Sequence, residues 1–424
     1  MTAEPSSTAE TCCSDDYDPN SLPADEARRR ILETVAPVTG REHLPIRTAL
    51  GRVLAEPVTA RIDVPGHDNS AMDGYALNSR ELAGGGTVTL QVVGTSWAGK
   101  PYAGNIGPGQ CVRIFTGAVM PPEADTVVIQ EQVRRDGEAV HFDAAGQRPG
   151  QNVRRAGEDI RAGQRVLAPG RRLTPADLGL LASVGVGEVT VHRRPRVAFF
   201  STGDELRGVG EPLAPGQIYD SNRYTLYGML TRLGVDLLDM GVVPDRPEAI
   251  RAAFAEAAEA ADVVMTSGGV SVGEADYVKE TLDALGEVRF WKVAIKPGRP
   301  LAFGRVGGAW FFGLPGNPVS VMVTFYLFAQ PALRRMMGET PTEPLHIRVP
   351  CTTALKKRPG RMEFQRGVLE RDPQGRWSVR KTGPQGSGIL SSMSEANCLI
   401  VLPLESAGVE PGAEVEVIPF CELT

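Results

Sequence analysis

Two carboxylates follow a glycine turn in residues 262–277, which read DVVMTSGGVSVGEADY. The apolar run 263–265 predicts a buried parallel strand, and the turn Ser267-Gly268-Gly269 lets backbone N–H groups approach a ligand. A cradle for phosphate alone gains nothing from Glu274 and Asp276, because carboxylates repel an anion. These acids suit a divalent cation held between carboxylate and phosphate. The alternative is a βα turn whose glycines serve geometry and whose acids begin a helix.

A basic strip further along the chain adds the complementary charge. It contains Lys292, Lys296 and Arg299, and two prolines, Pro297 and Pro300, restrict its backbone. Acids beside glycine loops, together with these cations, predict metal-assisted chemistry on a phosphorylated ligand, with Mg²⁺ bridging carboxylate and phosphate. The alternative for the strip is a solvated strand end.

Two loops in the first half of the chain also gather polar side chains. Residues 67–75, HDNSAMDGY, suit a cation or a polar ligand, although such loops are more often a set of Asx turns. Residues 150–159 place two arginines beside Glu158 and Asp159, a grouping that also forms surface ion pairs. Residue types alone favour the structural interpretation of both loops.

The C-terminal part of the chain offers an arginine-bearing segment, 361–367, and a glycine and serine loop, 385–392. A forked cation and hydroxyl donors suit a tetrahedral oxyanion, because they meet its oxygens from several sides. The residues alone favour the alternative, a loop that packs over an arginine-bearing strand. A side-chain nucleophile is not indicated, since only five His occur and the GxSxG signature is absent.

The composition is that of a globular chain with more than one core. A length of 424 residues suggests about three domains. The formal net charge of -6 and the pI near 5.6 exclude a general nucleic-acid surface. Six Cys without a zinc-binding spacing suit reduced thiols. The polar start predicts no signal peptide, and the longest mostly apolar run, 319–329, is too short for a bilayer. We therefore expect a cytoplasmic protein with no nucleic-acid or membrane partner.

The first half of the chain alternates between helical and β patterns. Amphipathic spacing predicts a helix over 24–36 and a second short helix over 49–55. Short strand-like runs separated by Gly/Pro turns follow, and Thr174-Pro175-Ala176-Asp177 then begins another helix. The predicted parts are a disordered tail (1–22), a helical stalk (23–60 plus 161–194) and an inserted β module (61–160).

Buried strands and helices alternate from residue 196 to about 337, which predicts a doubly wound α/β domain over 195–340. Strands are expected over 197–200, 237–240, 263–266, 288–293 and 310–312, and helices over 222–233, 247–260, 276–285 and 318–336. Ligands bind outside the carboxyl ends of such strands, where three loops fall: 201–205, 267–269 and 313–318. The remaining residues, 341–424, predict a small β domain.

Taken in order, these segments resemble the molybdopterin molybdenumtransferases, the bacterial MoeA family to which the gephyrin E domain also belongs. The likeness covers the chain from about residue 25 to the C-terminus. It rests on eight motifs: DNSAMDGYA (68–76), TG (116–117), RAGED (155–159), TGDE (202–205), YDSN (219–222), the segment 266–277, KPG (296–298) and GLPGNP (313–318).

The resemblance implies a multidomain α/β plus β fold with four domains: an elongated helical stalk, an inserted β module, an α/β domain like that of the molybdopterin adenylyltransferases, and a C-terminal β barrel. It also implies a homodimer, in which Asp68 reaches the active site of the partner subunit. In this family the enzyme takes adenylated molybdopterin and molybdate, and with a divalent cation, expected to be Mg²⁺, inserts molybdenum and releases AMP.

The resemblance also implies roles for individual residues. Positions associated with activity are matched by Asp68, Thr116, Asp159, Glu205, Asp245, Asp276, Lys292 and Lys296. The expected metal ligands are Glu205, Glu274 and Asp276. The expected contacts of the substrate are Ser267, Gly268, Gly269, Ser271, Pro297, Pro315, Gly316, Asn317, Pro318, Arg361, Arg366, Ser387, Ser391 and Ser392. Phosphorus is then attacked with the help of charge neutralisation and without a covalent enzyme intermediate.

Two other functions compete with this interpretation. The first is a molybdopterin adenylyltransferase, which shares the α/β domain but normally consists of that domain alone. The second is a non-catalytic dimeric scaffold, because the related gephyrin E domain also dimerises to anchor receptors. Two positions depart from the family pattern, His67 where an aromatic is common and Arg299 where Lys is frequent. The sequence leaves open whether the oxyanion is molybdate or tungstate, and whether an adenylyltransferase docks transiently to deliver the substrate.

Overall fold

The computed structural model describes residues 20–268 and 277–423 of the chain. It divides into two compact units: unit 1 is Met1–Gly40 with His192–Thr424, and unit 2 is Arg41–Val191. Residues 1–19 of the predicted disordered tail (1–22), and the predicted site residues Gly269, Ser271, Glu274 and Asp276, lie outside the described residues. Residues 20–22 are described, and Leu22 exchanges backbone hydrogen bonds with Lys292 and Ala294, so the prediction of disorder is wrong for these last three residues.

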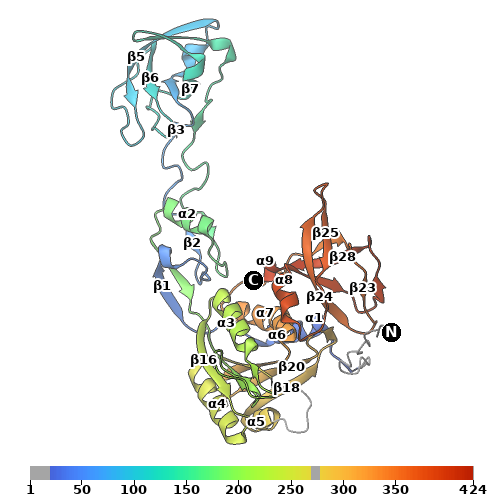
Figure 1. Cartoon of the computed structure of the whole chain (residues 1–424). Helices are drawn as coiled ribbons and strands as arrows, with labels where there is room; N and C mark the ends of the chain where they lie inside the picture. The colour runs from blue at the N-terminus through green and yellow to red at the C-terminus, as the bar shows by residue number, and fades with distance from the viewer. Residues whose placement is uncertain (1–19, 269–276, 424) are drawn as a thin grey trace. The chain divides into compact units, whose positions relative to one another are not determined.

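Unit 1 contains a six-stranded mixed sheet (Figure 1). Its strands in spatial order are β16 (Asp236–Val243), β13 (Arg196–Thr202), β17 (Val263–Ser267), β21 (Ala309–Leu314), β20 (Pro300–Val306) and β18 (Gly286–Lys292). The first four pair in parallel, whereas β20 is antiparallel to both of its neighbours. The strand β18 therefore runs in the same direction as β21, and five strands have their carboxyl ends at one edge of the sheet.

Helices cover both faces of this sheet, as a doubly wound fold requires. Figure 1 shows α4 (Pro247–Ala260) and α5 (Tyr277–Leu285) on one face and α3 (Ser221–Leu233) and α6 (Pro318–Thr324) on the other. Phe254 of α4 packs edge to face on Phe200 and Phe311, with ring centroids 5.2 and 5.5 Å apart. Such aromatic contacts stabilise a core beyond simple area burial.

The predicted strands and helices of this sheet are confirmed, but β20 is an addition to the prediction. Its sequence, PLAFGRV, contains Pro300 and Gly304, two residue types that weaken a strand pattern. A Cβ atom at Gly304 would lie 2.1 Å from the backbone oxygen of Glu287 in β18, so the close approach of the two strands requires glycine. The predicted helix over 318–336 runs from α6 through a π-helical turn (Phe325–Ala329) into α7 (Gln330–Met336).

A second sheet of unit 1 is built mostly from the C-terminal residues. Its strands in order are β19 (Ile295–Lys296), β24 (Met362–Arg371), β26 (Cys398–Leu402), β28 (Glu414–Pro419) and β22 (Ile347–Pro350), and β25 (Trp377–Lys381) also pairs with β24. A bridge between Cys351 and Val379 joins β25 to the residue after β22, so the hydrogen-bonded path returns to its start. The buried core inside this path includes Val379, Cys398 and Ile400.

The helix α1 (Ala24–Thr34) belongs to unit 1 by its contacts, whereas the prediction grouped it with the stalk. It buries Ala27 and Ile31, and it packs against α7 and the π-helical turn that precedes α7. An amphipathic pattern predicts the buried face of a helix but not the partner of that face, because the partner is distant in sequence.

Unit 2 contains a six-stranded sheet that carries the predicted strand-like runs. Its order is β7 (Thr126–Ile129), β4 (Gly74–Leu77), β6 (Gln110–Ile114), β5 (Thr87–Ser96), β9 (Ala139–Asp143) and β8 (Arg134–Asp136). Alternating residues of β4 enter two different clusters, Ala76 with Val112 and Ile114 on one face, and Tyr75 with Cys111 on the other. Both faces of the sheet are therefore covered by apolar side chains.

The rest of unit 2 contains short strand pairs and one helix, α2 (Pro175–Ser183). Thr174 and Asp177 form the predicted N-terminal cap, since each side chain accepts a hydrogen bond from the backbone N–H of the other. The pairs are β1 (Arg41–Pro45) with β12 (Glu188–His192), and β2 (Val58–Thr59) with β11 (Arg165–Leu167).

The predicted helix over 49–55 is wrong. Gly51 has a φ of 72°, a left-handed conformation that ends helical geometry, and Val53 and Leu54 form bridges to Arg172 and Val191. Among the described residues, α2 is the one α-helix of unit 2, so the predicted stalk is less helical than its pattern indicates. No helix in the described part of the chain has the length and apolar character needed to cross a membrane.

Candidate functional site

The topology of unit 1 brings three loops together at one edge of the sheet. We call these three loops the rim. The chain passes from β13 to β16 on one side and then returns to β17 on the other side of β13. This reversal creates the crevice in which α/β sheets bind ligands. The loops that begin there are Gly203-Asp204-Glu205 after β13, Gly268 after β17, and Pro315-Gly316-Asn317-Pro318 after β21.

Hydrogen bonds join these loops into one backbone surface. The N–H of Gly268 donates to the oxygen of Leu314 at 3.1 Å, and the Asn222 side-chain amide donates to the oxygen of Gly316 at 2.6 Å. Gly268 has a φ of 88°, and a Cβ atom there would lie 3.2 Å from the backbone oxygen of Thr202. Glycine at this position thus permits both the turn and the close approach of the loops.

Polar atoms beneath the loops retain free hydrogen-bonding capacity. Within the described residues, Thr266 Oγ1, Asp220 Oδ2 and Asn222 Oδ1 are buried without a hydrogen-bond partner. The hydroxyls of Ser201 and Ser267 lie 3.4 Å apart, and both residues are buried. Because most buried polar atoms of native proteins are paired, this concentration of unpaired atoms indicates groups available to a ligand or ordered water.

Three acids lie beside the first loop: Asp204, Glu205 and Asp245. The backbone N–H of Asp245 donates to Asp204 Oδ1 at 3.2 Å. Partial burial, and then the charges of Asp204 and Glu205, raise the pKa of the Asp245 carboxyl. A cation relieves such repulsion. Among the described residues, no three acidic, His or Cys side chains converge as a metal-ligand set, and Glu274 and Asp276 lie outside those residues.

The basic strip lies where the two sheets of unit 1 meet. Lys292 ends β18 and is exposed, while Lys296 lies in β19, which pairs with β24 of the second sheet. Lys296 Nζ is 3.8 Å from Glu363 Oε1, and Glu363 is 6% exposed. Pro297 is buried. The strip is therefore structurally anchored at Lys296 and does not form a loose strand end.

Arg366 of β24 is a fully buried guanidinium at 0% exposure. Its Nε donates to Ser392 Oγ at 2.9 Å, and its Nη2 donates to the oxygen of Gly386 at 2.9 Å. Its Nη1 is buried without a partner among the described residues. Burial lowers the pKa of Arg366 to about 10, so the group stays charged at neutral pH. A buried cation with a free donor is suited to an oxyanion.

The loop over Arg366 touches the start of α6. The oxygen of Ser387 accepts a hydrogen bond from the N–H of Val319 at 3.1 Å, one residue after the rim loop ends at Pro318. The structure thus brings Arg366, Ser387 and Ser392 together near one rim loop. Ser391 is exposed and Arg361 is half-buried. Side chains alternate along β24, so Arg366 points to the opposite face from Glu363 and Lys296.

The predicted site residues of unit 2, Asp68, Thr116 and Asp159, lie in three separate loops. Asp68 accepts hydrogen bonds from Arg155 Nη1 at 2.6 Å and from the N–H of Ala156 at 2.8 Å, which lower the pKa of its carboxyl. Thr116 donates to Asp73 Oδ1 through its N–H and its hydroxyl, at 2.8 and 2.7 Å. Asp159 is exposed. Arg155 pairs with Asp68 here, whereas the sequence suggested the acids beside it.

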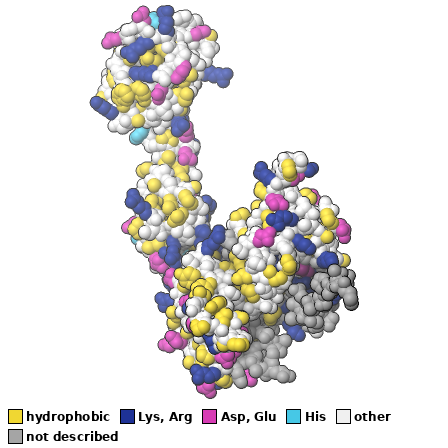
Figure 2. All heavy atoms as spheres, in the orientation of Figure 1, with side chains coloured by type: hydrophobic (Ala, Val, Ile, Leu, Met, Phe, Trp, Pro, Cys, Tyr) yellow, Lys and Arg dark blue, Asp and Glu magenta, His cyan; other side chains and the backbone are white. Residues whose placement is uncertain are grey.

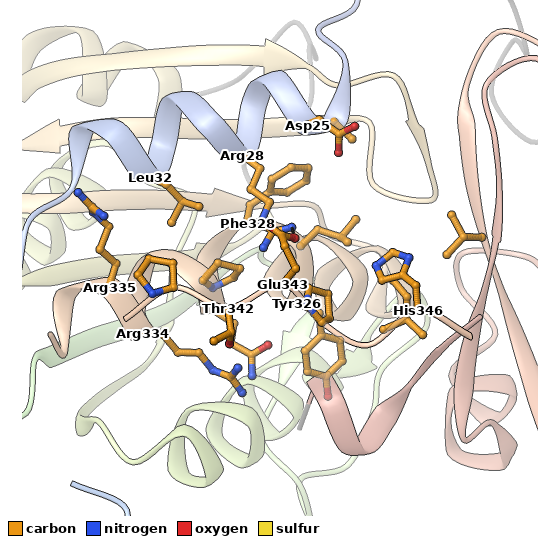
Figure 3. A pocket seen from close by; sticks show the side chains of 18 of the residues that line it. Asp25, Arg28, Leu32, Tyr326, Phe328, Arg334, Arg335, Thr342, Glu343 and His346 are labelled. Atoms are coloured by element: carbon orange, nitrogen blue, oxygen red, sulfur yellow. Dashed lines mark hydrogen bonds and ion pairs between the residues drawn. The ribbon is translucent and has the colours of Figure 1, made fainter. Parts of the chain in front are cut away.

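A cavity of about 260 Å³ lies away from these residues, between α1, α7 and the C-terminal sheet (Figure 3). In Figure 3, α1 runs along one side and turns Arg28 and Leu32 toward the cavity. Arg28 Nη1 donates to Glu343 Oε2 at 2.7 Å, and both residues line the cavity. None of the predicted site residues lines this cavity, so the rim and the cavity are separate features.

Sequence reasoning assigned no role to three residues that the structure places in the site. Asn222 and Asp220 belong to the motif YDSN, and Glu363 follows Arg361 by two residues, yet these patterns carry no chemical signal by themselves. Their importance comes from contacts: Asn222 holds Gly316, and Glu363 lies beside Lys296. A sequence without a structure gives no signal for such long-range pairs.

The fold and the rim define an α/β protein of the molybdopterin-binding class. Residues 198–335 match the family described as "Probable molybdopterin binding domain". Residues 22–185 match "MoeA N-terminal region (domain I and II)", and residues 348–420 match "MoeA C-terminal region (domain IV)". The chain belongs to the molybdopterin molybdenumtransferase (MoeA) family.

Relatives match along nearly the whole chain. A molybdopterin molybdenumtransferase of Haemophilus influenzae is 44% identical over 403 residues, which are 95% of this chain and 99% of the relative. Gephyrin of Dictyostelium discoideum is 33% identical over 94% of this chain and 62% of its own length. The crystal structure of the molybdopterin biosynthesis moeA protein from Pyrococcus horikoshii OT3 covers 94% of this chain and 100% of its own, with 29% identity and a TM-score of 0.82. The multidomain α/β plus β fold is thus shared with this family.

Proposed function

We propose that this protein inserts molybdenum from molybdate into adenylated molybdopterin and releases AMP, as a transferase of molybdenum cofactor biosynthesis. The family membership and the printed names of the relatives support this reaction. The observation that carries the proposal is the pairing, in unit 1, of a glycine rim with a buried Arg366 whose Nη1 has no partner among the described residues. The backbone N–H groups of the rim are suited to binding the diphosphate, and a buried guanidinium is suited to binding an oxyanion.

Different residues of the chain bind different parts of the substrates in this reaction. The loops at Gly268 and Gly316 present backbone to the phosphates, and Lys292 and Lys296 bring positive charge to the same edge. Arg366 with its serine loop holds molybdate or the pterin phosphate. An oxygen atom of molybdate or of water then attacks a phosphorus atom of the diphosphate, the bridging P–O bond breaks and AMP leaves. The negative charge that develops is neutralised by the cationic side chains, and no covalent enzyme intermediate forms.

A divalent cation, which we propose to be Mg²⁺, would complete this site. Carboxylate oxygens are the ligands that Mg²⁺ prefers, and the raised pKa of Asp245 indicates excess negative charge that a cation relieves. Glu205, with Glu274 and Asp276, would hold the cation. When bound, Mg²⁺ neutralises charge on the diphosphate.

The wider assignment follows the family pattern. We assign a stalk (23–60 plus 161–194), a β module (61–160), an α/β domain (195–340) and a C-terminal barrel (341–424), in a homodimer in which Asp68, with Thr116 and Asp159, serves the partner subunit's site. The path of strands that returns through Cys351 and Val379 supports the barrel. The free thiols of Cys111 and Cys398 are in keeping with a cytoplasmic location.

AMP release from adenylated molybdopterin tests the reaction. We expect release by the purified protein only when molybdate and Mg²⁺ are both present, because molybdate is a substrate and the cation neutralises the diphosphate. Omission of each component in turn is the control. If no AMP appears while molybdopterin and ATP are converted to the adenylate, the protein is an adenylyltransferase and the proposal is wrong.

An apolar surface on unit 1 supports the homodimer. Figure 2 shows hydrophobic side chains gathered where α3 lies. Tyr224 and Tyr227 of α3 are exposed, and so are Val209, Leu213, Ile218 and Tyr219 in the segment that precedes α3. Contiguous exposed apolar surface often marks an interface. We expect sedimentation to give twice the 45.4 kDa chain mass, and Tyr227→Lys to shift the protein toward monomer.

The matched control for this test is Leu50→Lys, which changes a residue of similar exposure in unit 2. A charged side chain is costly in an apolar interface but not in solvent, so only Tyr227→Lys is expected to dissociate the protein. A wild-type monomer at micromolar concentration contradicts the homodimer.

A further inference from the structure

One end of the unit 2 sheet carries an aromatic residue that the proposed function does not use. Trp97 follows the end of β5, Phe115 follows the end of β6, and Asp73 precedes β4. The pairings of Ser96 and Gly74 with Ile114 place these three residues at the same end of the sheet. Thr116 follows Phe115, so the aromatic residues adjoin a residue that the family likeness places in the active site.

The side chains form a stacked series from the core to the surface. Tyr75 is 4% exposed, and the Arg113 guanidinium lies over its ring at 4.9 Å. The same guanidinium is 5.1 Å from the ring of Phe115, which stacks on Trp97 with centroids 4.2 Å apart and planes 11° apart. Gln130 and the oxygen of Gly74 accept the hydrogen bonds of Arg113. One face of the Trp97 ring is therefore packed against Phe115.

The backbone also holds Trp97 in place. It exchanges two hydrogen bonds with Lys100, of 3.0 and 2.9 Å, across a tight turn at Ala98 and Gly99. Directly opposed residues of such a pair present their side chains on the same face. An indole ring and an ammonium group therefore share one face of this turn.

Single exposed hydrophobic residues are common on proteins and need no function. Trp97 differs because one ring face is covered by Phe115 while the residue remains 50% exposed. A ring that is fixed before binding loses little conformational entropy when a ligand stacks on it. The arrangement is that of a preformed stacking surface.

We propose that Trp97 stacks on a flat heteroaromatic ring that carries a phosphate, and that Lys100 contacts the phosphate. This inference rests on the proposed function, whose substrate has two such rings, a pterin and an adenine. Trp97 is thus a substrate-binding residue of the unit 2 face that includes Thr116. The chemistry of stacking is shared by both rings, so binding experiments distinguish them.

The test measures the affinity of the intact protein for AMP and, separately and without oxygen, for molybdopterin. We expect Trp97→Ala to weaken the binding of one of the two ligands by about tenfold to a hundredfold, since stacking of a base on an aromatic ring contributes that much. Trp97→Phe retains a stacking ring and is expected to keep most of the affinity. The ligand that responds identifies the ring.

Trp377→Ala is the matched control, because Trp377 is 48% exposed and one face of its ring lies against the Arg371 guanidinium, but it belongs to unit 1. We expect wild-type affinity for both ligands. Equal affinities of Trp97→Ala and wild type overturn the stacking role, as does a wild-type protein that binds neither ligand. Molybdate-dependent AMP release by the wild type is scored separately, so the proposed function stands or fails on its own.

Discussion

Arg366→Met is expected to reduce molybdate-dependent AMP release by about a hundredfold, the effect of removing one oxyanion donor from a preorganised site. The reason is that Arg366 is a buried cation whose Nη1 has no partner among the described residues, while Nε and Nη2 are fixed by Ser392 and Gly386. The measurement is the initial rate of AMP release against molybdate concentration. Arg366→Lys keeps the charge but loses the fork, and an intermediate rate is expected.

The stability of the Arg366→Met variant separates binding from folding. Methionine has a similar length and removes an incompletely paired buried charge, so the free energy of unfolding is expected to change by no more than about 2 kcal/mol. Ser392 Oγ still donates to the oxygen of Ile389 at 2.6 Å. Arg371→Met, in the same strand but exposed, is the control and is expected to keep full activity. A folded Arg366→Met protein with wild-type molybdate dependence contradicts the oxyanion role.

The α/β part of the fold is predictable because its elements have strong local patterns. The strand Val263–Ser267 begins with the apolar run 263–265, and α4 has helical spacing with a proline at its first turn. The failures occur where long-range geometry overrides the pattern. The segment over 49–55 has apolar residues at helical spacing, but Gly51 adopts a left-handed conformation and the chain turns into bridges.

The site is predictable only to the level of its loops. Parallel topology alone brings the loops at Gly203, Gly268 and Gly316 to one edge. The partners of the charged residues depend on contacts between distant segments, such as Lys296 with Glu363 in the second sheet. From the sequence alone, each charged residue of a loop has several possible ion-pair partners, and only the fold determines which pair forms.

The buried state of Arg366 is also beyond sequence reasoning. Arginine is rarely fully buried, so a surface position is the ordinary expectation. The serine loop that covers it is ordered by Gln385, whose side-chain oxygen accepts from the N–H of Arg366 at 2.8 Å. Residue types therefore predict that an anionic ligand is bound, but only the packing of the folded chain indicates that Arg366 is the buried cation available to bind it.

Asp245→Asn is expected to lower AMP release by about a hundredfold if charge stabilisation at this edge drives the reaction. The substitution keeps the backbone N–H that donates to Asp204 Oδ1 and removes only the charge. It is also expected to reduce the rise in unfolding temperature on addition of Mg²⁺, because a ligand that binds the folded state stabilises it less when its dissociation constant is higher. Rates and melting temperatures are measured across a Mg²⁺ titration.

The same substitution is expected to stabilise the protein slightly at pH 7. Partial burial and the neighbouring acids raise the pKa of Asp245, so its charge opposes folding once the pH exceeds the ordinary Asp value near 4. Below that pH the carboxyl is protonated in both states, and the gain in the variant disappears. Because Asp245 is exposed, solvent screens the repulsion and the gain is about 0.5 kcal/mol or less.

Asp236→Asn is the control for both effects, since Asp236 is an exposed acid at the opposite end of β16. It removes one charge from the strand that precedes Asp245 without touching the rim, and unchanged activity and Mg²⁺ response are expected. Full activity of Asp245→Asn removes Asp245 from the site. A stability gain that is equal at pH 4 and pH 7 shows that charge repulsion is not its cause, and the cluster of Asp204, Glu205 and Asp245 then has no excess charge for a cation to relieve.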